Sequence, residues 1–140
     1  MSPSKRILVL CTGNSARSQM AEGLLREESD GTYEVFSAGT HPGSVQPEAI
    51  AVMAEVGIDI AHHRSKSLDE FTGQSFDTII TVCSKASERC PSFPGDPERI
   101  AWDFNDPAVV EGEERRLLAY RRVRDELLRR IRLFLLVQKD

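Results

Sequence analysis

Residues 5–10, KRILVL, end in four consecutive aliphatic side chains and lead directly into Cys11. An uninterrupted aliphatic run is typical of a strand buried on both faces, as in the middle of a parallel sheet. Residues 12–16 form a short loop that contains a glycine, and from Arg17 apolar or small side chains recur at helical spacing as far as residues 29–31. The first 31 residues therefore predict a buried strand, a loop and a helix in immediate succession.

The rest of the chain repeats this alternation of strand and helix patterns. Further strands are expected at residues 33–37, 76–82 and 100–102. A helix from Pro47 to a stop at Gly57 should bury one face, and a long helix from Glu113 onward should bury another. The expected buried positions are Ala49, Ile50, Met53 and Val56 in the first helix and Tyr120, Val123, Leu127, Ile131 and Phe134 in the second. We predict a single α/β domain over residues 1–140, with a parallel sheet and right-handed crossovers.

The composition excludes several classes of protein. The chain is 40% hydrophobic and 29% charged, and the apolar run after Lys5 and Arg6 is too short for a signal sequence or a membrane span, so we expect a cytoplasmic protein. A net charge of -4 argues against nucleic acid as a partner. We expect the aliphatic tail at 131–138, IRLFLLVQ, to pack in the core, with a dimer contact as the lesser alternative.

Cys11 lies at the predicted junction of strand and helix, where the N–H groups of residues 12–17 can converge with the helix dipole behind them. Such a site binds anions, and its field should lower the pKa of the Cys11 thiol below the ordinary value of about 8.5. Arg17 adds a planar guanidinium that can hold two oxygens of a tetrahedral oxyanion, and the hydroxyl of Ser18 can donate to the sulfur. The predicted oxyanion-binding residues are Thr12, Gly13, Asn14, Ser15, Ala16 and Arg17. Taken alone, Cys11 could instead be a small buried hydrophobic side chain.

Two further cysteines, Cys83 and Cys90, are separated by the polar, helix-compatible segment SKASER. If that segment is helical, their Cα atoms lie about 10 Å apart along the axis. A disulfide needs about 4.4 to 6.8 Å, so this pair can bridge only if the helix unwinds. The alternatives are two unpaired structural cysteines or a zinc site with His62 and His63, whose spacing does not fit the usual zinc patterns. An odd number of cysteines in a reducing compartment favours reactive thiols or metal ligands over permanent disulfides.

The motif C-x5-R-S, formed by Cys11, Arg17 and Ser18, resembles the signature of the low-molecular-weight protein tyrosine phosphatase family. The longer stretch CTGNSARSQMAEG is similar to the arsenate reductases that share this fold and depend on thioredoxin. The resemblance continues over nearly the whole chain, through SAGT at 37–40, the Cys83 and Cys90 pair, Asp106-Pro107 and RRVRDEL at 121–127. It implies a four-stranded parallel sheet of strand order 2-1-3-4 flanked by helices.

The resemblance also implies a relay between the cysteines. Cys11 would attack arsenate, Cys83 would attack Cys11 and release arsenite, and Cys90 would attack Cys83 to leave a Cys83–Cys90 disulfide for thioredoxin. Asp106, before Pro107, is the expected general acid, with Asp103 as the alternative. The expected catalytic residues are Cys11, Arg17, Ser18, Cys83, Cys90 and Asp106. Reduced thioredoxin would be the electron donor of a monomer that holds no bound cofactor or metal, and phosphate would compete with arsenate.

Some reductases of this family bind potassium beside the anion loop, through groups that match Asn14, Glu22 and Ser37 and a fourth, acidic position. That fourth position is Lys66 here, and its ammonium could take the place of the cation against Glu22. We therefore predict that activity is insensitive to potassium; the alternative is an ordinary solvated lysine. His62 and His63 are expected at the surface, the alternative being that one of them helps to deprotonate Cys83.

Two other functions use the same residues. A tyrosine phosphatase would need Cys11, Arg17 and Asp106 but not the other two cysteines. In this family aromatic residues typically follow the Asp-Pro to bind the phosphotyrosine ring, whereas Ala108 and Val109 follow it here, which disfavours aryl phosphates. The third possibility is a non-catalytic thiol protein that captures arsenite or a soft metal.

Overall fold

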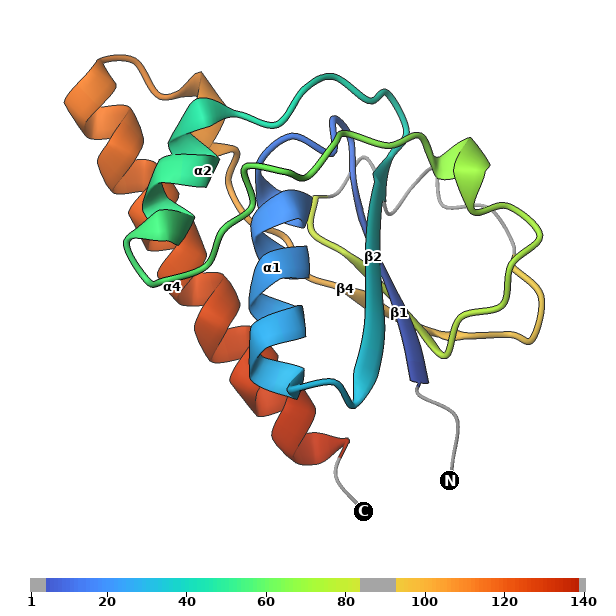
Figure 1. The fold of residues 1–140 in the computed structure, drawn as a ribbon. Helices are drawn as coiled ribbons and strands as arrows, with labels where there is room; N and C mark the ends of the chain where they lie inside the picture. Colours follow the sequence, from blue (N-terminus) through green and yellow to red (C-terminus); the bar gives the residue numbers. More distant parts are fainter. Residues whose placement is uncertain (1–4, 84–92, 139–140) are drawn as a thin grey trace.

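The computed structural model describes residues 5–83 and 93–138. It contains the strands β1 (Lys5–Cys11), β2 (Tyr33–Gly39), β3 (Thr78–Thr81) and β4 (Glu98–Ala101). All neighbouring pairs are parallel, and the order β2-β1-β3-β4 confirms the predicted topology (Figure 1). Residues 7–10 of β1 are completely buried, as their aliphatic run predicts for a central strand.

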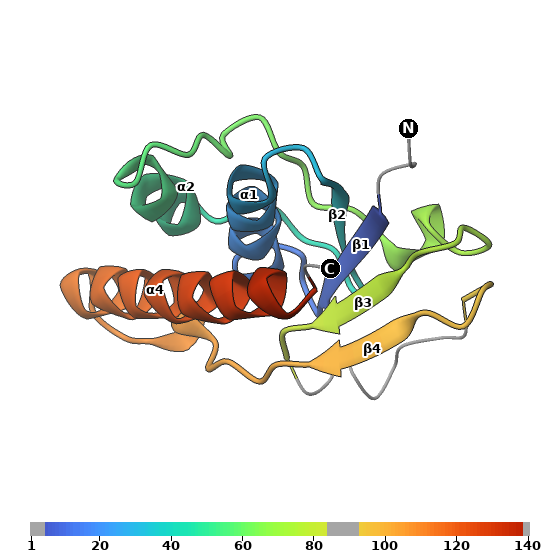
Figure 2. The same ribbon diagram turned by 90° about the horizontal axis from the view of Figure 1, so that it is seen from below.

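The helices α1 (Arg17–Ser29), α2 (Pro47–Ala54) and α4 (Glu113–Val137) lie on one side of this sheet (Figure 2). The segment with the short 3₁₀ helix η1 (Leu68–Glu70) lies on the other side, where Phe71 and Phe76 contact Phe36 of β2. A second 3₁₀ helix, η2 (Pro107–Val109), precedes α4. In the described part of the chain, no helix is long and apolar enough to cross a membrane. The carboxyl ends of β1 and β3 meet at one edge of the sheet, which is where parallel α/β sheets bind ligands.

Helix α2 is shorter than predicted, and Val56 is exposed rather than buried. The N–H groups of Gly57 and Ile58 bind the carbonyl oxygens of Ala54 and Met53, with Gly57 at a φ of 79°. The Val56 N–H binds the carbonyl oxygen of Met53, three residues back, and α2 has already ended at Ala54, so Val56 does not continue the helical face that buries Met53.

Helix α4 buries all five predicted residues. The expectation that its aliphatic tail packs in the core is only partly right, because Leu133, Leu136 and Val137 are exposed. Their spacing places them on the side of the helix turned away from the stripe that carries Ile131 and Phe134.

Candidate active site

The loop between β1 and α1 runs beside the segment that follows β2. Main-chain N–H groups of residues 40–46 bind carbonyl oxygens of the loop: Thr40 binds Cys11 at 3.3 Å, His41 binds Thr12 at 2.8 Å, Gly43 binds Gly13 at 3.1 Å, and Gln46 binds Ser15 at 2.9 Å. In a trans peptide the C=O and the next N–H point in opposite directions. The N–H groups that follow these carbonyls therefore face the other side of the loop.

That inner side carries the thiol of Cys11. The backbone of Gly13 forms a hydrogen bond with the Cys11 sulfur. Helix α1 begins after Ala16 without a side-chain cap, so the N–H groups of its first turn keep their bonding capacity on this side. The structure thus brings together the N–H groups of residues 12–17, Cys11 and the positive end of a helix, an arrangement that suits an anion.

The buried side chain of Asn14 fixes the conformation of the loop through four hydrogen bonds. It is completely buried in the left-handed region, with a φ of 47°. Its amide nitrogen donates to the hydroxyls of Ser18 at 2.8 Å and Ser37 at 2.9 Å, while its Oδ1 accepts from the Lys66 backbone at 2.7 Å and from Gln19 at 3.0 Å. Because Ser18 accepts from Asn14, its own proton is left for another acceptor, which suits the predicted donation to the Cys11 sulfur.

Cys11 and Cys83 form a contact pair at the carboxyl ends of β1 and β3. Both side chains are buried, and the Thr12 hydroxyl lies 3.3 Å from the Cys83 sulfur. The hydrogen bond with Cys83 and the burial of Cys11 raise the pKa of the Cys11 thiol, against the opposing effects of Arg17 and the Gly13 backbone. The predicted lowering of this pKa is therefore wrong for the structure as it stands, because the strand pairing brings a second sulfur against the first.

Asp106 is connected to the anion loop by its contact with Arg17. The Arg17 guanidinium donates to the Phe104 carbonyl at 2.9 Å and lies 3.7 Å from Asp106 Oδ2. The other Asp106 oxygen accepts from the Ala108 N–H at 3.0 Å, which begins η2. Asp103 is exposed and takes no part in this contact with Arg17. The structure therefore brings together Arg17 and Asp106, the expected acid, rather than the alternative.

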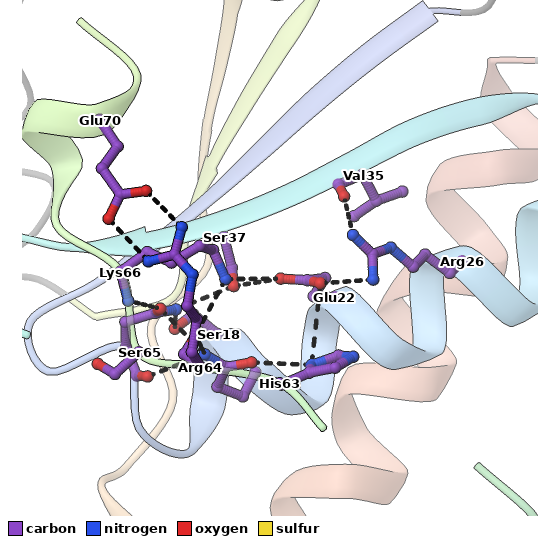
Figure 3. A network of polar contacts seen from close by, with 12 residues as sticks. Ser18, Glu22, Arg26, Val35, Ser37, His63, Arg64, Ser65, Lys66 and Glu70 are labelled. Carbon is purple, nitrogen blue, oxygen red and sulfur yellow. Dashed lines mark hydrogen bonds and ion pairs between the residues drawn. The ribbon is translucent and has the colours of Figure 1, made fainter. Parts of the chain in front are cut away.

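Glu22 is the centre of a buried ionic network below the loop (Figure 3). Its carboxylate accepts from the Ser37 hydroxyl and lies 2.8 Å from Arg26 Nη1 and 3.5 Å from Lys66 Nζ. Burial lowers the pKa of Lys66, and Glu22 opposes this shift. The expected placement of Lys66 against Glu22 is confirmed, and the solvated alternative is wrong.

His63 and Gln19 complete this network. His63 has a side chain only 6% exposed, and its Nδ1 lies 2.9 Å from Gln19 Oε1, so the expectation that both histidines are at the surface holds only for His62. Burial lowers the pKa of His63 although Glu22 opposes this. The sequence reasoning missed Gln19; the available signal was a cluster of polar residues at 18, 19 and 22 inside a helix that must pack on a sheet.

Cys90 lies outside the described residues, as does the expected helix that precedes it. Of the Cys83–Cys90 pair, only Cys83 is therefore described, and the zinc alternative lacks one of its four expected ligands in the described residues. Among residues 5–83 and 93–138, no group of three histidines, cysteines or acidic residues could hold a metal ion.

Comparison with known proteins agrees with this geometry. The model of the low molecular weight phosphotyrosine protein phosphatase family matches residues 6–140. An arsenate reductase of Halalkalibacterium halodurans is 44% identical over 131 residues, which are 93% of this chain and 94% of that protein. A solved arsenate reductase in its phosphate-binding state superposes with a TM-score of 0.79 at 29% identity, covering 96% of this chain and 99% of that one.

A second solved structure also matches the chain. It is a thioredoxin-dependent arsenate reductase of Corynebacterium glutamicum, 27% identical with a TM-score of 0.71, and the match covers 98% of this chain and 65% of that one. The family model spans all the residues of the candidate site. The chain belongs to the low molecular weight phosphotyrosine protein phosphatase family.

Proposed function

We propose that this protein is an arsenate reductase that passes two electrons from thioredoxin to arsenate through Cys11, Cys83 and Cys90. The observation that carries the proposal is the contact between the buried Cys11 and Cys83 thiols beside a loop built for an anion. A phosphatase needs the loop, Arg17 and Asp106, but it has no use for a second thiol against its nucleophile. The similarity to arsenate reductases over nearly the full length of both chains supports the same choice.

The first step is attack of Cys11 on arsenic. The thiol passes its proton to an oxygen of the arsenate dianion, and the sulfur displaces one oxygen, which leaves as water with a proton from Asp106. The N–H groups of residues 12–17 and the guanidinium of Arg17 stabilise the charge on the remaining oxygens. The Ser18 hydroxyl donates a hydrogen bond to the Cys11 sulfur, which is the nucleophile in this step and the leaving group in a later one.

The second step reduces arsenic. Cys83, deprotonated, attacks the Cys11 sulfur; the S–As bond breaks, its electron pair stays on arsenic, and arsenite leaves with arsenic reduced from As(V) to As(III). The Cys11–Cys83 disulfide then reacts with the Cys90 thiolate, which frees Cys11 and forms a Cys83–Cys90 disulfide. Two thiols of thioredoxin reduce that disulfide and become oxidised in turn. The contact between Cys11 and Cys83 lets the first disulfide form with little movement of either strand.

We further propose that the enzyme works in the cytoplasm as a monomer, with thioredoxin and arsenate as its partners and phosphate as a competitor. A reducing compartment keeps the three thiols available. Val109, which follows Asp106-Pro107-Ala108, is 73% exposed and offers no aromatic surface to the ring of an aryl phosphate. Hydrolysis of phosphotyrosine is therefore a weak side reaction of the same loop.

The test is NADPH oxidation by the reduced full-length protein with arsenate, thioredoxin and thioredoxin reductase. We expect steady turnover by the wild type and loss of turnover in both Cys83→Ser and Cys90→Ser. Release of a single equivalent of arsenite in the Cys90→Ser variant would place that residue after the arsenic step. Efficient phosphotyrosine hydrolysis that survives both substitutions, without arsenate-dependent oxidation, would contradict the proposal and select a phosphatase. Tight arsenite binding without turnover would select a thiol-based sensor.

A further inference from the structure

Two carbonyl oxygens of the anion loop are bound by side chains. Ser65 Oγ donates to the Gly13 oxygen at 2.8 Å and accepts from the Gly43 N–H at 3.1 Å. Gln19 Nε2 donates to the Asn14 oxygen at 3.1 Å. Both side chains therefore hold peptide groups within the stretch that faces the anion.

The orientation of the Gln19 amide is determined by its surroundings. Its nitrogen faces three oxygen acceptors, Asn14 O at 3.1 Å, Asn14 Oδ1 at 3.0 Å and Arg64 O at 2.9 Å. Its oxygen faces His63 Nδ1 at 2.9 Å. The reverse orientation would set the amide oxygen against three other oxygens, so His63 must donate from Nδ1. Gln19 is completely buried, which leaves no water to replace these bonds.

Each of these bonds sets the direction of one donor in the loop. Within a planar trans peptide, an outward carbonyl turns the next N–H inward. The Gly13 oxygen accepts from both Ser65 Oγ and the Gly43 N–H, and Ser65 also holds that Gly43 N–H, so Ser65 helps to direct the Asn14 N–H. The bond from Gln19 to Asn14 directs the Ser15 N–H. A rotation of either peptide group would point a carbonyl oxygen at the bound anion and exchange an attraction for a repulsion.

We propose that Gln19 and Ser65 are positioning residues for oxyanion binding: they hold the Asn14 and Ser15 N–H groups toward the arsenate without touching it. The inference rests on the proposed use of this loop as an oxyanion site. His63 fixes the orientation of Gln19 in turn, because its Nδ1 proton binds the Gln19 oxygen and so keeps the Gln19 nitrogen turned toward the loop.

The experiment measures phosphate binding to the reduced full-length protein by titration calorimetry, together with kcat and KM for arsenate. Ser65→Val and Ser65→Thr have nearly the same shape and differ in the hydroxyl. We expect Ser65→Val to weaken phosphate binding up to about tenfold, the value of one partly buried hydrogen bond, and Ser65→Thr to stay close to the wild type. The loss should appear in KM more than in kcat, since the thiol exchanges need no anion donor.

Gln19→Glu keeps the size of the side chain but places a carboxylate oxygen against the Asn14 and Arg64 carbonyls, and we expect it to weaken phosphate binding at least as much. Gln19→Met is the second variant, with no donor and no added charge. Ile131→Val, on the buried face of α4, is the control for a general loss of stability, and it should lower the melting temperature without changing phosphate affinity.

Unchanged phosphate affinity in Ser65→Val and in both Gln19 variants would overturn the inference, as would equal losses in Ser65→Thr and Ser65→Val. An equal loss in Ile131→Val would also overturn it, because the effect would then follow from stability alone. These results differ from a failure of the proposed function, in which the wild type itself does not reduce arsenate. A wild type that binds phosphate but does not reduce arsenate would refute the function and leave the positioning of the donors open to the same measurements.

Discussion

Lys66 holds its ammonium nitrogen 3.5 Å from Glu22 Oε1, below the anion loop. Glu22 is 2% exposed, and a carboxylate buried in this way is stabilised by positive charge close to it. Arg26 supplies one cation at 2.8 Å, and Lys66 supplies a second one that is part of the chain. A dissolved potassium ion would have to displace this ammonium and overcome its repulsion. We therefore expect the rate of arsenate reduction to be the same in potassium and sodium salts.

The measurement compares initial rates in the two chlorides at matched ionic strength. Lys66→Asp should bring a dependence on potassium, because it removes the internal cation and adds an acidic ligand beside Glu22. Lys5→Asp, at an exposed position, makes the same change of charge away from the network and should behave as the wild type. Activation of the wild type several-fold by potassium over sodium would disprove the prediction.

Gly39 makes room for the anion loop at the end of β2. A Cβ atom there would lie 2.7 Å from the Thr12 carbonyl oxygen and 2.9 Å from the Asn14 nitrogen. These are backbone atoms that cannot move without shifting the loop. We expect Gly39→Ala to lower the free energy of unfolding by about 1 to 3 kcal/mol and to weaken phosphate binding, as measured by urea unfolding and calorimetry.

Gly43 provides the matched control, since it lies in the adjoining segment and nothing comes within 4 Å of an added Cβ. Gly43→Ala keeps the N–H that binds the loop and should change the free energy of unfolding by no more than about 0.5 kcal/mol. Similar stabilities and phosphate affinities in the two variants would show that the close approach at Gly39 is not needed.

The sheet and its topology could be predicted because the pattern of each element is local. The aliphatic run at 7–10 indicates a buried strand without any knowledge of its neighbours, and the stripe from Tyr120 to Phe134 indicates the buried face of α4. Helix ends were harder to predict. Val56 fits the helical period, but α2 ends at Ala54, before that residue is reached.

The residues of the candidate site that belong to a sequence motif could be predicted. Cys11 and Arg17 follow from their spacing, and Asp106 follows from the resemblance. The contact between Cys11 and Cys83 depends on which strands lie side by side, a relation between residues 72 positions apart that no local pattern contains. The same contact reverses the expected shift in the pKa of Cys11. His63 was misplaced for a similar reason, because its partner Gln19 lies on a different element.

Asp106, the proposed general acid, has one carboxylate oxygen 3.7 Å from the Arg17 guanidinium. Asp106→Asn keeps the hydrogen bond to Ala108 but has no acidic proton to give. We expect kcat for arsenate reduction to fall about 10²- to 10⁴-fold, with phosphate affinity largely retained. Asp103→Asn, at the exposed alternative, should leave kcat unchanged. If both variants keep the wild-type kcat, another group protonates the leaving oxygen.

The pKa of Cys11 should fall when Cys83 is removed. In the wild type, the hydrogen bond with Cys83 is the largest cause that raises this pKa, and the Arg17 charge and the Gly13 backbone act against it. A raised pKa means that the reactive thiolate forms only at higher pH. In Cys83→Ala the causes that lower the pKa remain, so the curve of Cys11 alkylation against pH should move toward lower pH. Peptide mass spectrometry after brief treatment with iodoacetamide measures the alkylation of Cys11 separately from that of the other cysteines.

Cys90→Ala is the control, because it leaves Cys83 unchanged, and it should not shift the curve of Cys11 alkylation against pH. A curve for Cys83→Ala that coincides with the wild type, or that moves toward higher pH, would mean that Cys83 does not hold Cys11 in its protonated form.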